Sequence, residues 1–128
     1  MDDNINLTAA EWQVMECLWD FSPATGREIC EDMEEEMGWN RSTTLTLLRR
    51  LEAKGAVKCG SEGSKKTFLP AIRREDAYYK ETRSLLSRAY EGSVSMMLSA
   101  FTKKQSLPQE EIDELYELLR ELEEKNDA

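Results

Sequence analysis

Basic and hydroxyl-bearing side chains are concentrated between residues 41 and 66 of this 128-residue chain. The segment holds seven lysines and arginines against two glutamates, a net charge of +5, although the whole chain carries −9. Residues 1–40, by contrast, hold one arginine against eleven acidic residues, a net charge of −10. A basic patch on an otherwise acidic protein is typical of a surface that contacts phosphates. This segment is therefore the first candidate for a nucleic-acid site.

The same segment carries side chains that read base pairs. Arginine donates paired hydrogen bonds to guanine or to phosphate, and threonine offers both a hydroxyl and a methyl group to thymine. If residues 40–54 form a helix, one face buries Thr44, Leu47, Leu48 and Leu51. The opposite side and its flanks then present Ser42, Thr46, Arg49, Thr43, Leu45 and Arg50. An ordinary solvated helix face explains this pattern equally well when the helix is taken alone.

Two more helices and a hairpin are expected around this helix. Capping boxes, each a threonine with a glutamate three residues later, predict helices over 8–21 and 25–38. Residues 56–59 and 67–72 are predicted to form two strands joined by a flexible tip over 60–66, which carries Lys65 and Lys66. The order of these elements predicts a winged helix-turn-helix, whose third helix enters the major groove while the wing contacts the flanking backbone.

The rest of the chain is predicted to be helical, with apolar stripes too large for these helices to bury against each other. The predicted fold is therefore mainly α with a small β-hairpin wing, in which residues 1–72 bind DNA and residues 73–128 form a helical dimerisation domain. Packing of the stripes back on the winged domain is the alternative. The predicted dimerisation residues are Tyr90, Val94, Met97, Leu98, Phe101, Ile112, Leu115, Leu119 and Leu122.

Several classes of function are disfavoured. The chain has no histidine, no glycine-rich phosphate loop and no clustered metal ligands, so we expect neither an enzyme nor a metal or cofactor site. The three cysteines Cys17, Cys30 and Cys59 are far apart and are expected to be free thiols, with a redox role for Cys59 as the less favoured alternative. Without a signal peptide or an apolar run of membrane-spanning length, we expect a cytoplasmic protein with no direct membrane binding.

The chain resembles the penicillinase repressor (BlaI/MecI) family of bacterial transcription regulators. The resemblance rests on Leu7-Thr-Ala-Ala-Glu-Trp-Gln-Val-Met15, on Thr43-x-x-Thr46-Leu-Leu-x-Arg50-Leu51-x-x-Lys54-Gly55 and on the hairpin that follows. It continues through Tyr90-Glu-Gly92 to Leu107-Pro-Gln-Glu-Glu-Ile112-Asp-Glu-Leu115 and so covers nearly the whole chain.

The resemblance implies a homodimeric repressor on a pseudo-palindromic double-stranded DNA operator. It also implies relief by a membrane sensor with a zinc-metalloprotease domain, which leads to repressor cleavage at a site matching Ala100-Phe101. Two departures stand out: Leu45 replaces a basic residue and Ala100 replaces an asparagine of the resistance repressors, so the operator is expected to differ and cleavage is left open. Because the C-terminus lacks paired cysteines, copper sensing is disfavoured.

On the DNA-binding interpretation, two groups of residues have different roles. One group is expected to reach bases or adjacent phosphates: Arg41, Ser42, Thr43, Leu45, Thr46 and Arg49. Arg50, Lys65 and Lys66 are expected mainly to hold the DNA backbone. The competing interpretation is a winged helix that binds another protein through its acidic surface, without specific DNA binding.

Overall fold

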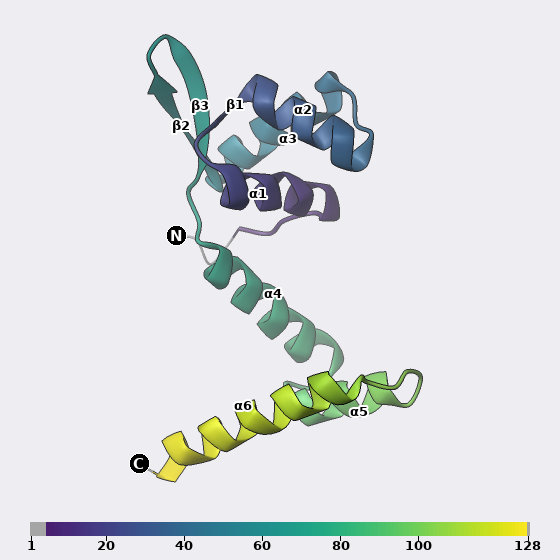
Figure 1. Ribbon diagram of the computed structural model, residues 1–128. Helices are drawn as coiled ribbons and strands as arrows, with labels where there is room; N and C mark the ends of the chain where they lie inside the picture. The colour runs from purple at the N-terminus through teal and green to yellow at the C-terminus, as the bar shows by residue number, and fades with distance from the viewer. Residues whose placement is uncertain (1–4, 128) are drawn as a thin grey trace. The chain divides into compact units, whose positions relative to one another are not determined.

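The computed structural model describes residues 5–127 and divides into two compact units, of which the first ends at Glu81 and the second begins at Thr82. The first unit contains α1 (Ala9–Phe21), β1 (Ala24–Thr25), α2 (Gly26–Met37), α3 (Arg41–Lys54), β2 (Val57–Glu62) and β3 (Lys65–Pro70) (Figure 1). Helix α4 (Arg74–Ala89) runs from the first unit into the second, which also contains α5 (Val94–Thr102) and α6 (Gln109–Asp127).

The ends of the first three helices are fixed by local chemistry. Both predicted capping boxes are confirmed, since the backbone N–H of Glu11 donates to Thr8 Oγ1 at 3.2 Å and that of Glu28 donates to Thr25 Oγ1 at 3.2 Å. Asn40 caps α3 by accepting the N–H of Thr43 at 2.8 Å. The recognition-helix candidate therefore begins where the sequence predicted.

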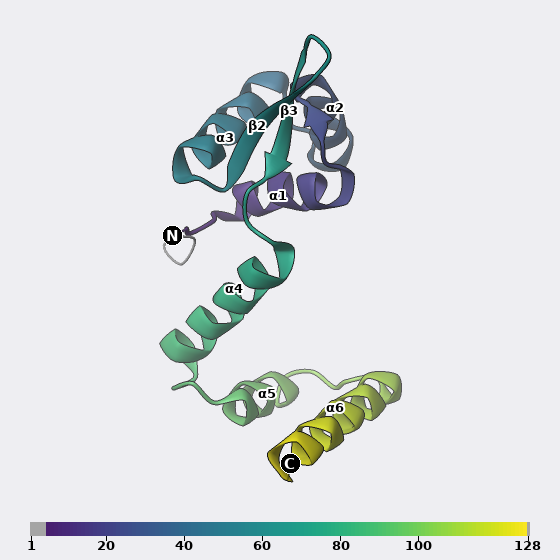
Figure 2. The same ribbon diagram turned by 90° about the vertical axis from the view of Figure 1, so that its left-hand side faces the viewer.

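The sheet is antiparallel with the strand order β1-β3-β2 (Figure 2). The prediction of a flexible tip over residues 60–66 is wrong: the strands continue to the pair Glu62–Lys65, and only two residues form the turn. Gly63 provides the positive φ, 64°, that such a tight turn needs. The outer half of the hairpin is exposed on both faces, so the sequence lacks the apolar alternation that would have revealed these strands. The two-residue strand β1 was also not predicted.

The core of the first unit lies between its three helices and the sheet. Helix α3 contributes the face predicted for it, because Thr44, Leu47, Leu48 and Leu51 are all buried. The core also contains Val14, Met15, Leu18, Ile29, Met33, Val57 and Phe68. Burying one side of α3 in this way fixes which side chains remain on its outer surface.

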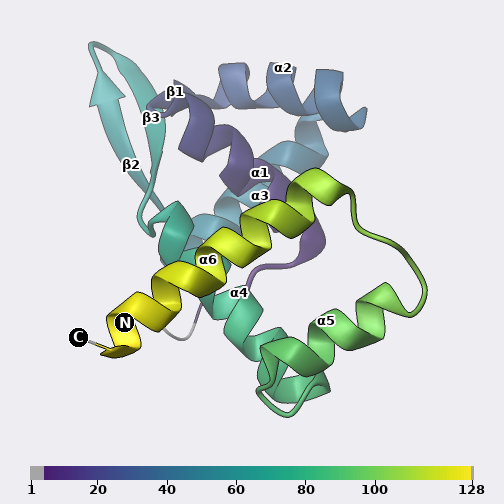
Figure 3. The ribbon, with the colours of Figure 1, turned by 60° about the horizontal axis from the view of Figure 1, so that its bottom comes forward.

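The second unit has a different character. Its helices α5 and α6 are joined by a loop (Figure 3). Neither these two helices nor α4 contains a buried residue, and α6 leaves Leu118, Leu119 and Leu122 more than half exposed. The helical prediction for this region is confirmed. Within residues 5–127, none of the helices has the length and apolar character needed to cross a membrane.

A charge pair joins the beginning of α1 to the end of α3. The Glu11 side chain is 1% exposed, and its Oε1 accepts hydrogen bonds from Lys54 Nζ and from the Thr8 N–H. Burial raises the pKa of the Glu11 carboxyl, but the Lys54 and Thr8 hydrogen bonds and the Lys54 charge bring that pKa below its ordinary value of 4.5. The ionised carboxylate therefore stabilises the folded chain.

Replacing Glu11 by glutamine is expected to lower the free energy of unfolding near neutral pH by about 1–3 kcal/mol, because Lys54 loses its charged partner but can still reach water. Since the folded pKa lies below the unfolded one, this stabilisation is present above the unfolded pKa of Glu11 and is lost as pH falls through the lowered folded pKa. Urea unfolding from neutral to acidic pH measures both effects. Glu117→Gln, at an exposed pair with Arg120, is the control. An unchanged pH dependence in the Glu11 variant would contradict this account.

Candidate nucleic-acid interface

The outer surface of α3 carries most of the predicted DNA-binding residues. Arg41, Ser42 and Thr43 are exposed in its first turn, and Arg49 and Arg50 are exposed two turns later. Thr46 lies between them and is half-buried. These side chains stay outside because the opposite face of the same helix is packed into the core. The result is an outward surface of guanidinium and hydroxyl groups, suited to phosphates and base edges.

Leu45 occupies a less exposed position than the sequence suggested. Its side chain is half-buried and packs against the core cluster of the first unit. A Cβ added to Gly26 would lie 3.8 Å from Leu45 Cδ2 and 3.6 Å from Phe68 Cε2, so the three residues are close neighbours. Leu45 therefore lies between the outer surface of α3 and the hydrophobic core, and only part of its side chain is accessible.

The predicted wing lysines point to different sides of the hairpin. Lys65 and Lys66 are consecutive residues of β3, paired with Glu62 and Ser61, and consecutive strand residues face opposite ways. The Lys66 ammonium lies 5.2 Å from the centroid of the Phe68 ring, on one face. The prediction that both lysines belong to the hairpin tip is therefore wrong. As consecutive strand residues they lie on opposite faces of the hairpin and do not form one continuous basic patch.

A further lysine belongs to this basic surface. Lys58 is exposed on β2, opposite Leu69, and shares the face of the hairpin that carries Lys65. Lys58 is not among the predicted site residues, because the sequence alone does not determine the register of the two strands. Alternation along the correctly extended strands identifies it.

The thiols of the first unit are poorly suited to redox chemistry. Burial, with a smaller contribution from Asp32, raises the pKa of the Cys17 thiol to about 12, and burial also raises that of Cys30. Cys59 is exposed, but partial burial and its hydrogen bond to Glu52 Oε2, at 3.0 Å, raise its pKa as well. Thiols that stay protonated are weak nucleophiles, which favours the free-thiol interpretation. Across the described residues, no group of three or more acidic or cysteine side chains is placed to hold a metal ion.

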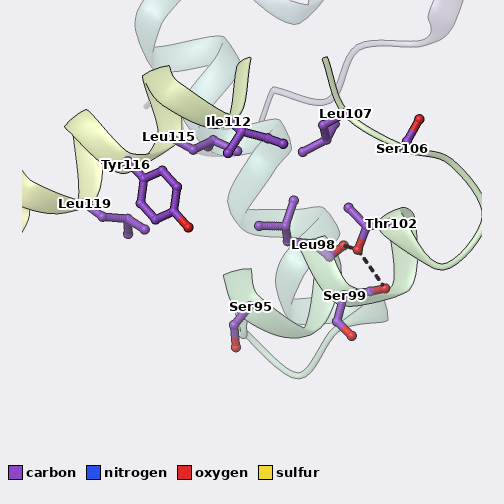
Figure 4. A pocket seen from close by; sticks show the side chains of 10 residues that line it. All are labelled: Ser95, Leu98, Ser99, Thr102, Ser106, Leu107, Ile112, Leu115, Tyr116 and Leu119. Atoms are coloured by element: carbon purple, nitrogen blue, oxygen red, sulfur yellow. Dashed lines mark hydrogen bonds between the residues drawn. The ribbon is translucent and has the colours of Figure 1, made fainter. Parts of the chain in front are cut away.

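The predicted dimerisation residues lie along α5 and α6, except Tyr90, which directly follows the end of α4. An open apolar groove of about 680 Å³ separates these helices, with Leu98, Leu107, Ile112, Leu115 and Leu119 on its walls (Figure 4). Val94, Phe101 and Leu122 are exposed, whereas Tyr90, Met97, Leu98, Ile112 and Leu115 are half-buried. The predicted cleavage site, Ala100-Phe101, is exposed near the end of α5.

Comparison with known proteins decides the family. The family described as penicillinase repressor matches residues 7–121. The chain belongs to this family. The penicillinase repressor of Bacillus licheniformis is 32% identical over 115 residues, which cover 90% of each chain. The methicillin resistance regulatory protein MecI of Staphylococcus aureus is 27% identical over 113 residues, covering 88% of this chain and 92% of MecI.

Solved structures extend the comparison to the fold of penicillinase repressors. The DNA-binding domain of the repressor BlaI has a TM-score of 0.51 and 30% identity, covering 56% of this chain and 87% of that domain. Monomeric Bacillus licheniformis BlaI in complex with the blaP half-operator has a TM-score of 0.52 and 29% identity, covering 56% and 88%. These structures confirm the predicted fold class. Membership in a family of repressors confirms the expectation that the chain is not an enzyme.

Proposed function

We propose that this chain is a cytoplasmic transcriptional repressor that binds a pseudo-palindromic DNA operator as a homodimer. The observation that carries the proposal is the basic surface of α3 and the wing, which has the opposite charge from the chain as a whole. The BlaI structure with a half-operator supports DNA as the partner. Residues 1–72 are the proposed DNA-binding part and residues 73–128 the proposed dimerisation part.

In this proposal, α3 lies in the major groove. Arg41, Ser42, Thr43, Thr46 and Arg49 reach bases or adjacent phosphates, and the accessible part of Leu45 contacts a thymine methyl group. Arg50, Lys65 and Lys66 hold the DNA backbone from α3 and from the wing. The opposite directions of Lys65 and Lys66 make the two lysines separable by experiment.

Replacing Lys66 by alanine is expected to weaken binding to all duplexes about equally and to reduce the slope of log K against log salt by about 1, because one phosphate contact is lost. Fluorescence anisotropy over a range of salt concentrations measures this slope. Lys104→Ala, which removes the same charge from the connection between α5 and α6, is the control. A slope equal to that of the unaltered protein would argue against the Lys66 contact.

A second copy of the chain is the proposed occupant of the α5–α6 groove. Leu119, on the groove wall, and Leu122, beyond it, are both more than half exposed, so the apolar surface continues past the groove. Burial of such a surface by a second copy is favourable at roughly 25 cal/mol per Å² of apolar area. Two half-site readers joined in this way bind a palindromic operator far more tightly than either reader alone.

Relief of repression is proposed to follow cleavage at Ala100-Phe101, triggered through a membrane sensor protease system. Helix α5 is nine residues long and contributes no buried residue, so local opening of this helix costs little free energy. Cleavage there separates α6 from α5 and divides the groove. Mass spectrometry of the repressor from induced cells tests this step, and an intact chain under full induction would contradict it.

A winged helix that binds another protein is the competing function. The three consecutive exposed glutamates of α2, residues 34–36, favour it. Affinity no better than about micromolar at low salt for every duplex tried would support this alternative and contradict the repressor proposal.

A further inference from the structure

The first half of α4 is fastened to α1 by two pairs of side chains. On each helix the two partners are four residues apart and therefore lie on one face. The Arg74 guanidinium lies 2.7 Å from Asp20 Oδ1 and 3.8 Å from Glu16 Oε2. The Tyr78 hydroxyl donates to Glu16 Oε1 at 2.8 Å. All of these contacts fall within the first compact unit.

Aromatic rings also pack between α1 and α4 at this contact. The Tyr78 ring centroid lies 5.8 Å from that of Trp12 and 6.0 Å from that of Trp19, and the two tryptophans are 5.8 Å apart. Arg74 also lies 5.5 Å from the Trp19 ring centroid, within cation–π distance. Trp19 Nε1 donates to the Ile72 carbonyl at 3.0 Å, which holds the chain where it enters α4.

A third attachment follows half a turn later. Lys80 Nζ donates to the Ile5 carbonyl at 2.7 Å, and Ala77 packs against the core cluster. The first half of α4 is thus part of the winged unit, although the helix itself continues to Ala89. The direction in which α4 leaves α1 is set inside the first unit.

We propose that Arg74 and Tyr78 are positioning residues that determine which half-site separation the repressor accepts. The proposal rests on the dimeric operator binding proposed above. A dimer reads two half-sites at a fixed separation only if each winged unit is held rigidly to the helix that connects it to the dimerisation part, here α4. The clamp, formed by Glu16, Asp20, Arg74 and Tyr78, holds the start of α4 against α1 of the winged unit.

The test uses the full chain and the double variant Arg74→Gln/Tyr78→Phe, which removes the Arg74 charge and the Tyr78 hydroxyl but keeps an aromatic ring at position 78. Arg73→Gln is the matched control, since it removes the same charge from the neighbouring residue, which pairs with Glu75 rather than with α1. The probes are duplexes with one operator half-site and duplexes with two half-sites whose separation is changed by one base pair at a time. Anisotropy titrations give the affinity for each.

The double variant is expected to bind the single half-site within about twofold of the unaltered chain, yet to lose about fivefold or more of its discrimination against wrong separations. The Arg73 control is expected to keep that discrimination. Unchanged discrimination in the double variant would overturn the inference, and so would a parallel loss of half-site affinity, which would show a role in folding alone. If the unaltered chain binds no duplex better than random DNA, the repressor proposal itself fails, and this inference fails with it.

Discussion

A chain in which Leu119 and Leu122 are both replaced by glutamine is expected to stay folded but to become monomeric, and to lose about a hundredfold or more in affinity for a full operator. Both side chains are more than half exposed, at 56% and 53%, so their polar replacement leaves no cavity inside the unit. The loss arises because two linked half-site readers become two independent ones.

Sedimentation equilibrium and operator titration measure the two effects together. Glu121→Gln, on the opposite side of α6, is the control and is expected to remain dimeric with unchanged operator affinity. Affinity for a single half-site is expected to be the same in all three proteins. A double leucine variant that remains dimeric would contradict the proposed interface along α5 and α6.

Replacing Arg49 by alanine is expected to lower affinity for the operator by about 1–3 kcal/mol and to relax specificity at one base-pair position. Arg49 is exposed on α3, and its Nε lies 3.4 Å from the Leu45 carbonyl, a long hydrogen bond that binding to a base can replace. Its guanidinium is therefore available for paired hydrogen bonds to guanine.

Arg50→Ala is the matched comparison, because it removes the same group from the next residue of the helix. It is expected to weaken all duplexes about equally, as loss of a backbone contact does. Titration against a set of operators with single base-pair changes separates the two outcomes. An Arg49 variant that loses the same free energy on operator and random DNA would show that Arg49 contacts phosphate and reads no base.

The helix starts of the first unit and the buried face of α3 could be predicted from local sequence signals. The threonine–glutamate capping boxes and Asn40 act within a few residues, so the starts of α1, α2 and α3 follow from the sequence. The buried face of α3 also follows, because one apolar stripe on a helix has one side to bury.

Long-range pairing accounts for what the sequence did not reveal. The outer hairpin has no apolar alternation, so its register, and with it the opposite directions of Lys65 and Lys66, appear only when β2 and β3 are paired. Leu45 was predicted on the flank of the exposed face of α3. Its position against the core depends on its neighbours Gly26 and Phe68, which are far away in sequence. The clamp between α1 and α4 likewise joins residues 54 or more positions apart.

Binding of the purified full chain to the DNA upstream of its own coding region, titrated against salt and random competitor, tests the repressor function directly. A dimeric repressor is expected to bind the upstream DNA tightly, to resist competitor and to lose affinity steeply as salt is raised. Equal and weak binding to upstream and random DNA would contradict it and would direct attention to a protein partner.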